Sequence, residues 1–288
     1  MMRILSPAKI NLHLRVGPLA VDGFHPLLTW MCTIGLYDTM EMTATDEPGI
    51  RLKCDRPDVP IDESNLIIRA ARALSPNLGA DVSLQKQIPL GGGLGGGSSN
   101  AAFALLGFNK LWNLNLLKAQ LTKIASQLGS DVPFFLHGPS SICTGRGQHV
   151  MPIPRPAAKY AVLFFPEFSI STPAVYKRFD EMKLGLAEAT HPRDDWTILT
   201  ELPTSDLLNI LINDLETPAI SLHPKLGQLR YRLEQAISRR VIMSGSGSTL
   251  FTLSDNKDDA ERIVAKISEP SIRTALFELA PAAPALYP

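Results

Sequence analysis

The sequence lacks the features that mark membrane-spanning and nucleic-acid-binding proteins. Its apolar runs are short, as over residues 160–166, and none approaches the roughly 18 residues that a membrane-spanning helix needs. The first residues contain no apolar stretch of the signal-peptide kind. The 28 basic residues are balanced by 28 acidic ones, and no polybasic run is present. We therefore expect neither a membrane nor a nucleic acid as partner.

Cysteine is also scarce. Cys32, Cys54 and Cys143 are odd in number, widely separated, and form no Cys-x-x-Cys pair. This pattern argues against a disulfide framework and against a zinc site, and it fits free thiols in a reducing compartment. The expected localisation is cytoplasmic.

Apolar residues, by contrast, make up 45% of the 288 residues, which is ample for packed cores. The length favours two modest domains over one. Three prolines fall within residues 151–156, the best candidate for a linker. We expect an N-terminal domain over residues 1–153 and a C-terminal α+β domain over residues 157–288.

Local patterns place strands and helices in both domains. Partial alternation over residues 8–16 predicts a strand with one face in water, and Lys9 and Asn11 share that face. Apolar residues at helical spacing predict a helix over residues 117–128, with Leu117 on its apolar face. Another helix is expected over residues 101–111.

The most informative segment is the glycine-rich stretch over residues 89–102. Six of its first nine residues are glycine, so the backbone can take positive φ and bring N–H groups close to an anion. The cluster Ser98-Ser99-Asn100 supplies N-cap residues for the helix that follows. A flexible linker is the alternative, but linkers seldom lead directly into a capped helix. We interpret the segment as a phosphate-binding loop.

Two familiar phosphate-loop patterns do not fit these residues. The spacing Gly91-x-Gly93-x-x-Gly96 matches the dinucleotide fingerprint, but no acidic residue for the ribose occurs between Gly97 and Ser130. In a Walker A loop the lysine position would be taken by Gly97 or Ser98. The charge of the phosphates must then be neutralised by a metal ion or by lysines elsewhere in the sequence, such as Lys9 or Lys86.

Three motifs in order resemble those of the GHMP small-molecule kinases. The first is Pro7-Ala8-Lys9-Ile10-Asn11-Leu12, the second is the glycine-rich segment that starts at Pro89, and the third is Met243-Ser244-Gly245-Ser246-Gly247-Ser248-Thr249. A simple hairpin turn is the alternative for the third. The resemblance implies a two-domain α+β kinase fold, with a mixed α/β N-terminal domain, a ferredoxin-like C-terminal domain, and ATP and Mg²⁺ as cofactors.

Further motifs are similar to one branch of that superfamily. They are Asp22-Gly23-Phe24-His25-Pro26-Leu27, Gly129-Ser130-Asp131-Val132-Pro133-Phe134-Phe135 and Asn213-Asp214-Leu215-Glu216. The branch phosphorylates the 2-hydroxyl of 4-diphosphocytidyl-2-C-methyl-D-erythritol in non-mevalonate isoprenoid biosynthesis. Homoserine or mevalonate as acceptor, or a non-catalytic nucleotide-binding protein of kinase descent, are the alternatives. The molecule is expected to be a monomer or a homodimer.

Phosphoryl transfer requires a positioned hydroxyl and neutralised charge, and a carboxylate can accept the hydroxyl proton. The resemblance implies that Asp131 is this base and that Lys9 is its catalytic partner, with Asn11 at the substrate. Position alone would favour an Asx-turn or a helix N-cap for Asp131, and an ordinary solvated side chain for Lys9; the resemblance reverses this for Asp131.

The resemblance also implies the binding residues. ATP is expected at the loop residues Pro89, Leu90, Gly91, Gly92, Gly93, Leu94, Gly95, Gly96, Gly97, Ser98 and Ser99, and its adenine near Asn65 and Lys86. Ser98 or Ser99 could reach Mg²⁺ or could only cap the helix. The expected substrate residues are Asn11, Phe24, His25, Thr172, Tyr176, Gly245 and Ser246. For Phe24, core packing is the alternative to stacking on cytosine.

The chain departs from the branch at three places. An arginine commonly precedes Asp-Gly-Tyr-His, where this chain has Pro18-Leu19-Ala20-Val21. Phe24 replaces the tyrosine, which removes a hydroxyl but keeps an aromatic face. Gln148 stands where glutamate is frequent.

Overall fold

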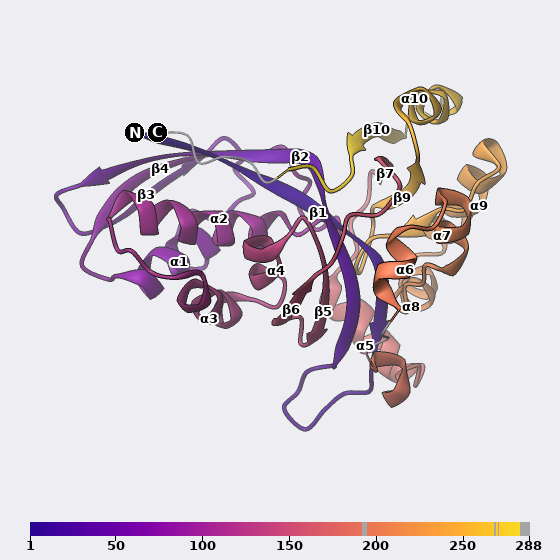
Figure 1. The fold of residues 1–288 in the computed structure, drawn as a ribbon, viewed down its shortest axis with the longest axis horizontal. Coiled ribbons are helices and arrows are strands. Elements are labelled where there is room, and N and C mark those ends of the chain that lie inside the picture. Colours follow the sequence, from indigo (N-terminus) through magenta and orange to yellow (C-terminus); the bar gives the residue numbers. More distant parts are fainter. Residues whose placement is uncertain (192–194, 268, 270, 283–288) are drawn as a thin grey trace.

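Two β-sheets with helices packed around them form the protein (Figure 1). The computed structural model describes residues 1–191, 195–267, 269 and 271–282, so the gaps all fall in the domain expected over residues 157–288. Helices and strands occur in both halves, as in the expected two-domain α+β fold.

The first sheet has six strands in the order β3-β4-β2-β5-β6, with β1 paired to β2. Their bounds are β1 (Met2–Val16), β2 (Leu27–Thr45), β3 (Gly49–Cys54), β4 (Gly79–Gln85), β5 (Ser140–Gly145) and β6 (His149–Pro152). The expected linker therefore begins later than predicted, because Met151 and Pro152 pair with β5 and only residues 153–159 lack regular structure before the next strand.

The long strands β1 and β2 connect the two halves of the molecule. They pair antiparallel over residues 2–16 and 27–42, with register shifts after Pro7 and after Asn11. Strand β2 pairs with β5 through residues 27–32 and with β4 through residues 39–45. In Figure 1 both strands cross the molecule from the N-terminal helices to the C-terminal elements.

The predicted water-facing side of β1 is wrong. Lys9 and Asn11 are only 3% and 4% exposed. The glycine-rich segment covers them, since the Lys9 backbone N–H donates to the Leu94 carbonyl at 2.9 Å. Ser244 covers them as well, because its hydroxyl accepts from the Asn11 backbone N–H at 3.2 Å. Buried polar side chains of this kind are uncommon on a strand, so Lys9 and Asn11 are candidate functional residues.

Four helices pack on one face of the first sheet, and Figure 1 shows them gathered on one side of the long strands. They are α1 (Leu66–Leu74), α2 (Gly96–Leu111), α3 (Lys118–Leu128) and α4 (Val132–His137). The central helix α2 is buried along most of its length because its residues are nearly all small or apolar. Leu117 precedes α3 and is exposed, so its predicted place on the apolar face of that helix is wrong.

The second sheet is antiparallel in the order β10-β7-β9-β8. Its strands are β7 (Tyr160–Pro166), β8 (Ile242–Met243), β9 (Leu250–Ser254) and β10 (Ile272–Glu278). The helices of this half are α5 (Thr172–Glu181), the 3₁₀ helix η1 (Ala187–Thr190), α6 (Trp196–Thr200), α7 (Thr204–Ile210), α8 (Glu216–Leu222), α9 (Pro224–Ile237) and α10 (Lys257–Lys266).

The two faces of this sheet join different cores. Val162 and Phe164 of β7 pack with apolar side chains of α5, α9 and α10. Ala161 and Leu163, on the other face, pack with buried residues of β1 and β2. The two sheets therefore share a core, and across it the first motif contacts the third through the Asn11–Ser244 hydrogen bond.

Candidate active site

A cleft of about 910 Å³ collects most of the residues predicted to be functional. Its lining includes Lys9, Asn11, Phe24, His25, Lys86, all residues from Pro89 to Ser98, Asp131, Arg146, Thr172, Tyr176, Gly245 and Ser246. Residues far apart in the sequence thus converge on one cavity. Asn65 and Ser99 do not line it.

The glycine-rich loop ends in a helix N-terminus at the cleft. Gly91, Gly93 and Gly95 have φ of +66°, +75° and +68°, a conformation that L side chains rarely adopt. Helix α2 begins at Gly96 with Gly95 as its N-cap, so the predicted start after the Ser98 cluster is wrong. Free backbone N–H groups of this first turn, together with the helix dipole, can bind an anion.

Ser98 and Ser99 lie in that first turn and do not cap it. Ser98 lines the cleft, whereas Ser99 is fully buried beneath it. No hydrogen-bond partner for the Ser99 hydroxyl is found among the described residues. The capping alternative is therefore excluded for both serines, and Ser98 is the hydroxyl that can reach a ligand.

The third motif packs directly on the glycine-rich loop. The Ser244 hydroxyl donates to the Gly93 carbonyl at 3.0 Å. A Cβ on Gly93 would lie 2.1 Å from the Ser244 carbonyl oxygen, so only glycine fits this contact. Residues 244–249 connect β8 to β9 as a hairpin turn would, and they also contact the glycine-rich loop. They close the end of the cleft beside Asn11.

Lys9 is held in a fixed position by three oxygens. Its ammonium donates to Asn11 Oδ1 at 2.6 Å and to the Gly93 carbonyl at 3.0 Å. The carboxylate of Asp131 is 3.3 Å away. The Asn11 amide in turn donates to the Thr29 hydroxyl at 2.9 Å. Lys9 is therefore not a solvated surface lysine, and its charge lies between the loop and Asp131.

Asp131 precedes α4 in the N-cap position, yet its side chain makes no capping hydrogen bond. The carboxylate instead turns toward Lys9 and is 32% exposed in the cleft. The N-cap alternative is thus excluded. An accessible carboxylate beside a buried ammonium can receive a proton from a bound alcohol.

An aromatic group forms the other end of the cleft. His25 and Tyr176 have ring centroids 5.2 Å apart, and His25 Nδ1 donates to the Gly17 carbonyl at 2.8 Å. Burial raises the pKa of Tyr176, and the negative charge of Asp131 adds to this. Phe24 is 49% exposed, so the core-packing alternative for this ring is excluded.

Arg146, which sequence analysis missed, holds the Phe24 loop. It comes from the turn between β5 and β6, and its guanidinium carbon lies 4.0 Å from the Phe24 ring centroid. It also pairs with Asp22 at 2.5 Å, and this hydrogen bond lowers the pKa of Asp22. No local pattern marks this arginine, because its contacts are about 120 residues away in the sequence.

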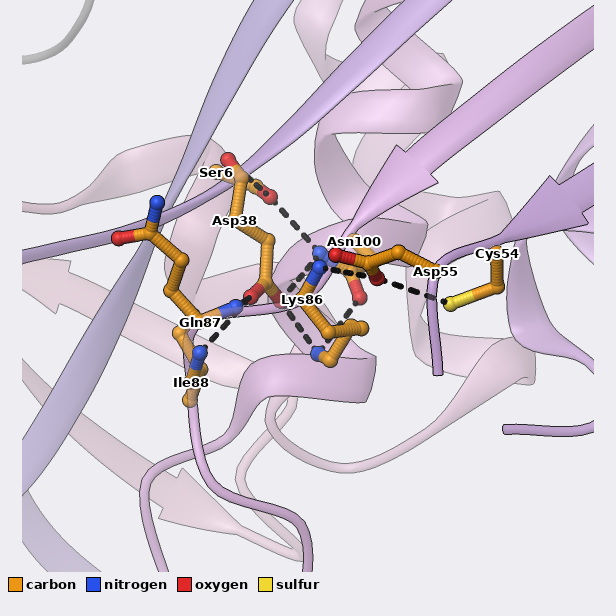
Figure 2. A network of polar contacts seen from close by, with 8 residues as sticks. All are labelled: Ser6, Asp38, Cys54, Asp55, Lys86, Gln87, Ile88 and Asn100. Atoms are coloured by element: carbon orange, nitrogen blue, oxygen red, sulfur yellow. Dashed lines mark hydrogen bonds and ion pairs between the residues drawn. The ribbon is translucent and has the colours of Figure 1, made fainter. Parts of the chain in front are cut away.

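Lys86 and Asp38 form a buried ion pair beneath the loop (Figure 2). Asp38 is fully buried and also accepts from the backbone N–H groups of Gln87 and Ile88, at 2.8 and 2.9 Å. Asn100 of α2 accepts from Lys86 at 3.1 Å and donates to Asp38 at 3.0 Å. Sequence analysis missed Asp38, although this network ties the loop to the sheet.

The remaining predicted residues fall in two places. Thr172 and Ser246 share a hydrogen bond of 2.6 Å at the cleft. Asn65 caps α1 outside the cleft lining, and its Oδ1 accepts from the Ile67 N–H at 2.9 Å.

No cluster of three or more His, Cys, Asp or Glu side chains able to hold a metal occurs in the described part of the chain.

Comparison with known proteins adds two family matches. The model of the GHMP kinases N terminal domain matches residues 65–139, and that of the GHMP kinases C terminal domain matches residues 200–272. No helix of the described residues is long and apolar enough to cross a membrane.

Curated relatives match nearly the whole chain. The 4-diphosphocytidyl-2-C-methyl-D-erythritol kinase of Salinispora arenicola is 39% identical over 92% of this chain and 87% of its own length. That of Syntrophus aciditrophicus is 38% identical over 94% and 96%. A crystal structure of 4-(cytidine 5'-diphospho)-2C-methyl-D-erythritol kinase superposes with a TM-score of 0.76 at 33% identity, covering 98% of this chain and all of that one. Homoserine kinase from Cytophaga hutchinsonii, at 17% identity and a TM-score of 0.71 over 97% and 94% of the two chains, shares the fold.

Proposed function

Because the chain belongs to the family of 4-diphosphocytidyl-2-C-methyl-D-erythritol kinases within the GHMP kinases, we propose that it phosphorylates the 2-hydroxyl of that cytidyl alcohol with ATP. The reaction belongs to non-mevalonate isoprenoid biosynthesis. The observation that carries the proposal is the 3.3 Å contact between Lys9 and Asp131 beside the glycine-rich loop.

In the proposed mechanism, Asp131 accepts the proton of the 2-hydroxyl as its oxygen attacks the γ-phosphorus. The bond between the γ-phosphorus and the bridging oxygen breaks, and ADP leaves with that oxygen. The Lys9 ammonium stabilises negative charge on the transferring phosphoryl group. The contact of Lys9 with the Gly93 carbonyl supports this role, because it aims the ammonium at the loop.

The loop residues from Pro89 to Ser98 are proposed to bind the phosphates of ATP through their backbone N–H groups. Ser98 would hold Mg²⁺, which suits an ion that takes few protein ligands and binds mainly to phosphate and water. When bound, the ion neutralises phosphate charge. Lys86 also faces this region, and its charge is shared with Asp38. Asn65 does not line the cleft, and we propose that it supports the adenine site indirectly, by capping the first turn of α1.

The cytosine is proposed to stack between Phe24 and Tyr176, with His25 at its edge. Two exposed or partly exposed aromatic faces at one end of the cleft support this, because a small acceptor needs no such surface. Thr172, Gly245 and Ser246 would contact the remainder of the substrate. We place the reaction in the cytoplasm, which the free thiols of Cys32 and Cys143 support.

A competition of acceptors tests the proposal. Purified protein is assayed for ATP-dependent phosphorylation of the cytidyl alcohol, homoserine and mevalonate under one set of conditions. We expect kcat/KM for the cytidyl alcohol to exceed the other two values by several orders of magnitude. A higher kcat/KM for homoserine or mevalonate would overturn the substrate, and no transfer to any acceptor would overturn the reaction.

A further inference from the structure

The motif Asn213-Asp214-Leu215-Glu216 lies where the two sheets meet, and the proposed mechanism assigns it no role. The Leu14 backbone N–H donates to the Ile212 carbonyl at 2.7 Å, and the Asp214 N–H donates to the Leu14 carbonyl at 2.9 Å. Residues 212–214 therefore run beside β1, directly after its catalytic part. Asn213 is only 6% exposed.

The Asn213 side chain holds the third glycine-rich motif from behind. Its Nδ2 donates to the Met243 carbonyl at 2.7 Å and to the Gly245 carbonyl at 2.8 Å. Its Oδ1 accepts from the Leu215 N–H at 2.9 Å. Both amide donors are therefore used, and the bond to Leu215 fixes which end of the amide faces the two carbonyls.

This arrangement decides where one peptide group points. The carbonyl and the N–H of a trans peptide point in opposite directions, so the Ser246 N–H faces away from Asn213. Gly245 and Ser246 line the cleft, whereas Asn213 does not. No acceptor for the Ser246 N–H is found among the described residues, whereas the Gly247 N–H donates to the Ser244 carbonyl at 3.0 Å.

The same peptide lies next to the reacting groups. A Cβ on Gly245 would be 3.3 Å from Asn11 Oδ1 and 3.3 Å from the Gly93 carbonyl oxygen. Both of those oxygens accept hydrogen bonds from Lys9. An N–H group that points into the cleft here faces the place where negative charge develops during phosphoryl transfer.

We infer that Asn213 is a positioning residue for this reaction: by holding the Gly245 carbonyl, it directs the Ser246 N–H toward an anionic oxygen of the bound phosphates. This inference rests on the proposed function. Asn213 itself touches no substrate, and it acts through the orientation of one peptide group.

The test compares Asn213→Asp and Asn213→Ala with wild type. Both variants lose the two donors, and the alanine variant avoids burying a charge. We expect kcat to fall about 100- to 1000-fold, as for loss of one oxyanion donor, with KM for ATP within about threefold of wild type. Asn209→Asp, the same change at an exposed site, should keep wild-type values.

A second pair of measurements separates positioning from general support of the fold. Glu216 accepts the Met243 N–H at 2.8 Å, so Glu216→Ala loosens the same strand without freeing the Gly245 carbonyl. We expect it to lower Tm but to keep kcat within about threefold. In wild type, the Ser246 amide proton should shift downfield on binding a non-hydrolysable ATP analogue with the cytidyl alcohol, which tests the inference without any variant.

Several outcomes would overturn the inference. They are wild-type kcat in folded Asn213→Ala, an equal loss of kcat in Glu216→Ala, or an unshifted Ser246 amide proton in the ternary complex. An inactive wild type would instead overturn the proposed function, and the inference with it. If wild type is active and Asn213→Ala has the same kcat, the inference is overturned and the proposed function stands.

Discussion

At the scale of single residues, buried polar groups distinguish this cleft from an ordinary surface groove. Lys9 and Asn11 are almost completely buried, and each is hydrogen bonded. Burial of a charged group is costly unless it is paired, so such groups are informative about function. Asp131 supplies the pairing charge while its carboxylate stays accessible.

The exposed Phe24 ring gives the first prediction. Phe24→Ala should raise KM for the cytidyl alcohol about tenfold or more, because loss of one base-stacking surface costs about 1–3 kcal/mol. Stability should change little, since the ring is 49% exposed. Steady-state kinetics with ATP held saturating would measure it. Phe24→Tyr, which keeps the face, is the matched control and should stay near wild type; a normal KM in Phe24→Ala would argue against stacking.

Sequence analysis located these residues but not their surroundings. The motifs around Lys9, Asp131 and the glycine-rich loop are contiguous, so they can be read from the chain. The burial of Lys9 depends on Leu94 and Ser244, which no local pattern connects to it. Asp38 was missed for the same reason, since its partner Lys86 is 48 residues away.

At the scale of elements, the glycine-rich loop is positioned by what lies behind it. Local patterns predicted the strand over residues 8–16 and the helix over residues 117–128. The start of α2, however, was placed after Ser98 because serines are good N-caps. Gly95 takes that position because its left-handed conformation lets the chain pass close to Lys9 and Phe135. Tertiary contacts at this loop outweigh local preference.

The ion pair beneath the loop gives the second prediction. Asp38→Asn leaves the buried Lys86 ammonium without an anion and should lower the free energy of unfolding by about 3–5 kcal/mol. Urea denaturation would measure the loss. Asp55→Asn, at an exposed residue that accepts the Lys86 backbone N–H, is the control and should cost under about 1 kcal/mol.

The double variant Asp38→Asn with Lys86→Met completes this test. It removes both charges, and it should recover most of the lost free energy, because an apolar replacement of a buried pair is often tolerated. Asp38→Asn as stable as wild type would show that the pair does not support the loop.

At the scale of the whole molecule, the two halves share a core and are joined by the Asn213-Asp214-Leu215-Glu216 motif. Burial raises the pKa of Asp214 and of Glu216, which lie at this junction. Each carboxyl group therefore releases its proton at a higher pH in the folded protein than in the unfolded chain. Their contribution to stability is present at low pH and is lost as pH rises above their ordinary values of 3.8 and 4.5.

The third prediction follows for Glu216→Gln, which cannot ionise. Its free energy of unfolding, measured relative to wild type, should increase as pH rises from 4.5 toward neutrality. Urea denaturation of both proteins at several pH values would show this trend. The opposite trend would mean that its ion pair with Arg230 outweighs its burial.

The central claim is that Asp131 primes the alcohol beside the amide groups of the glycine-rich loop, and the kcat of Asp131→Asn measures this most directly. We predict that kcat for phosphorylation of the cytidyl alcohol falls about 100- to 10,000-fold, with unchanged circular dichroism, while Asp206→Asn at an exposed site keeps full activity. Wild-type kcat in folded Asp131→Asn would contradict the account.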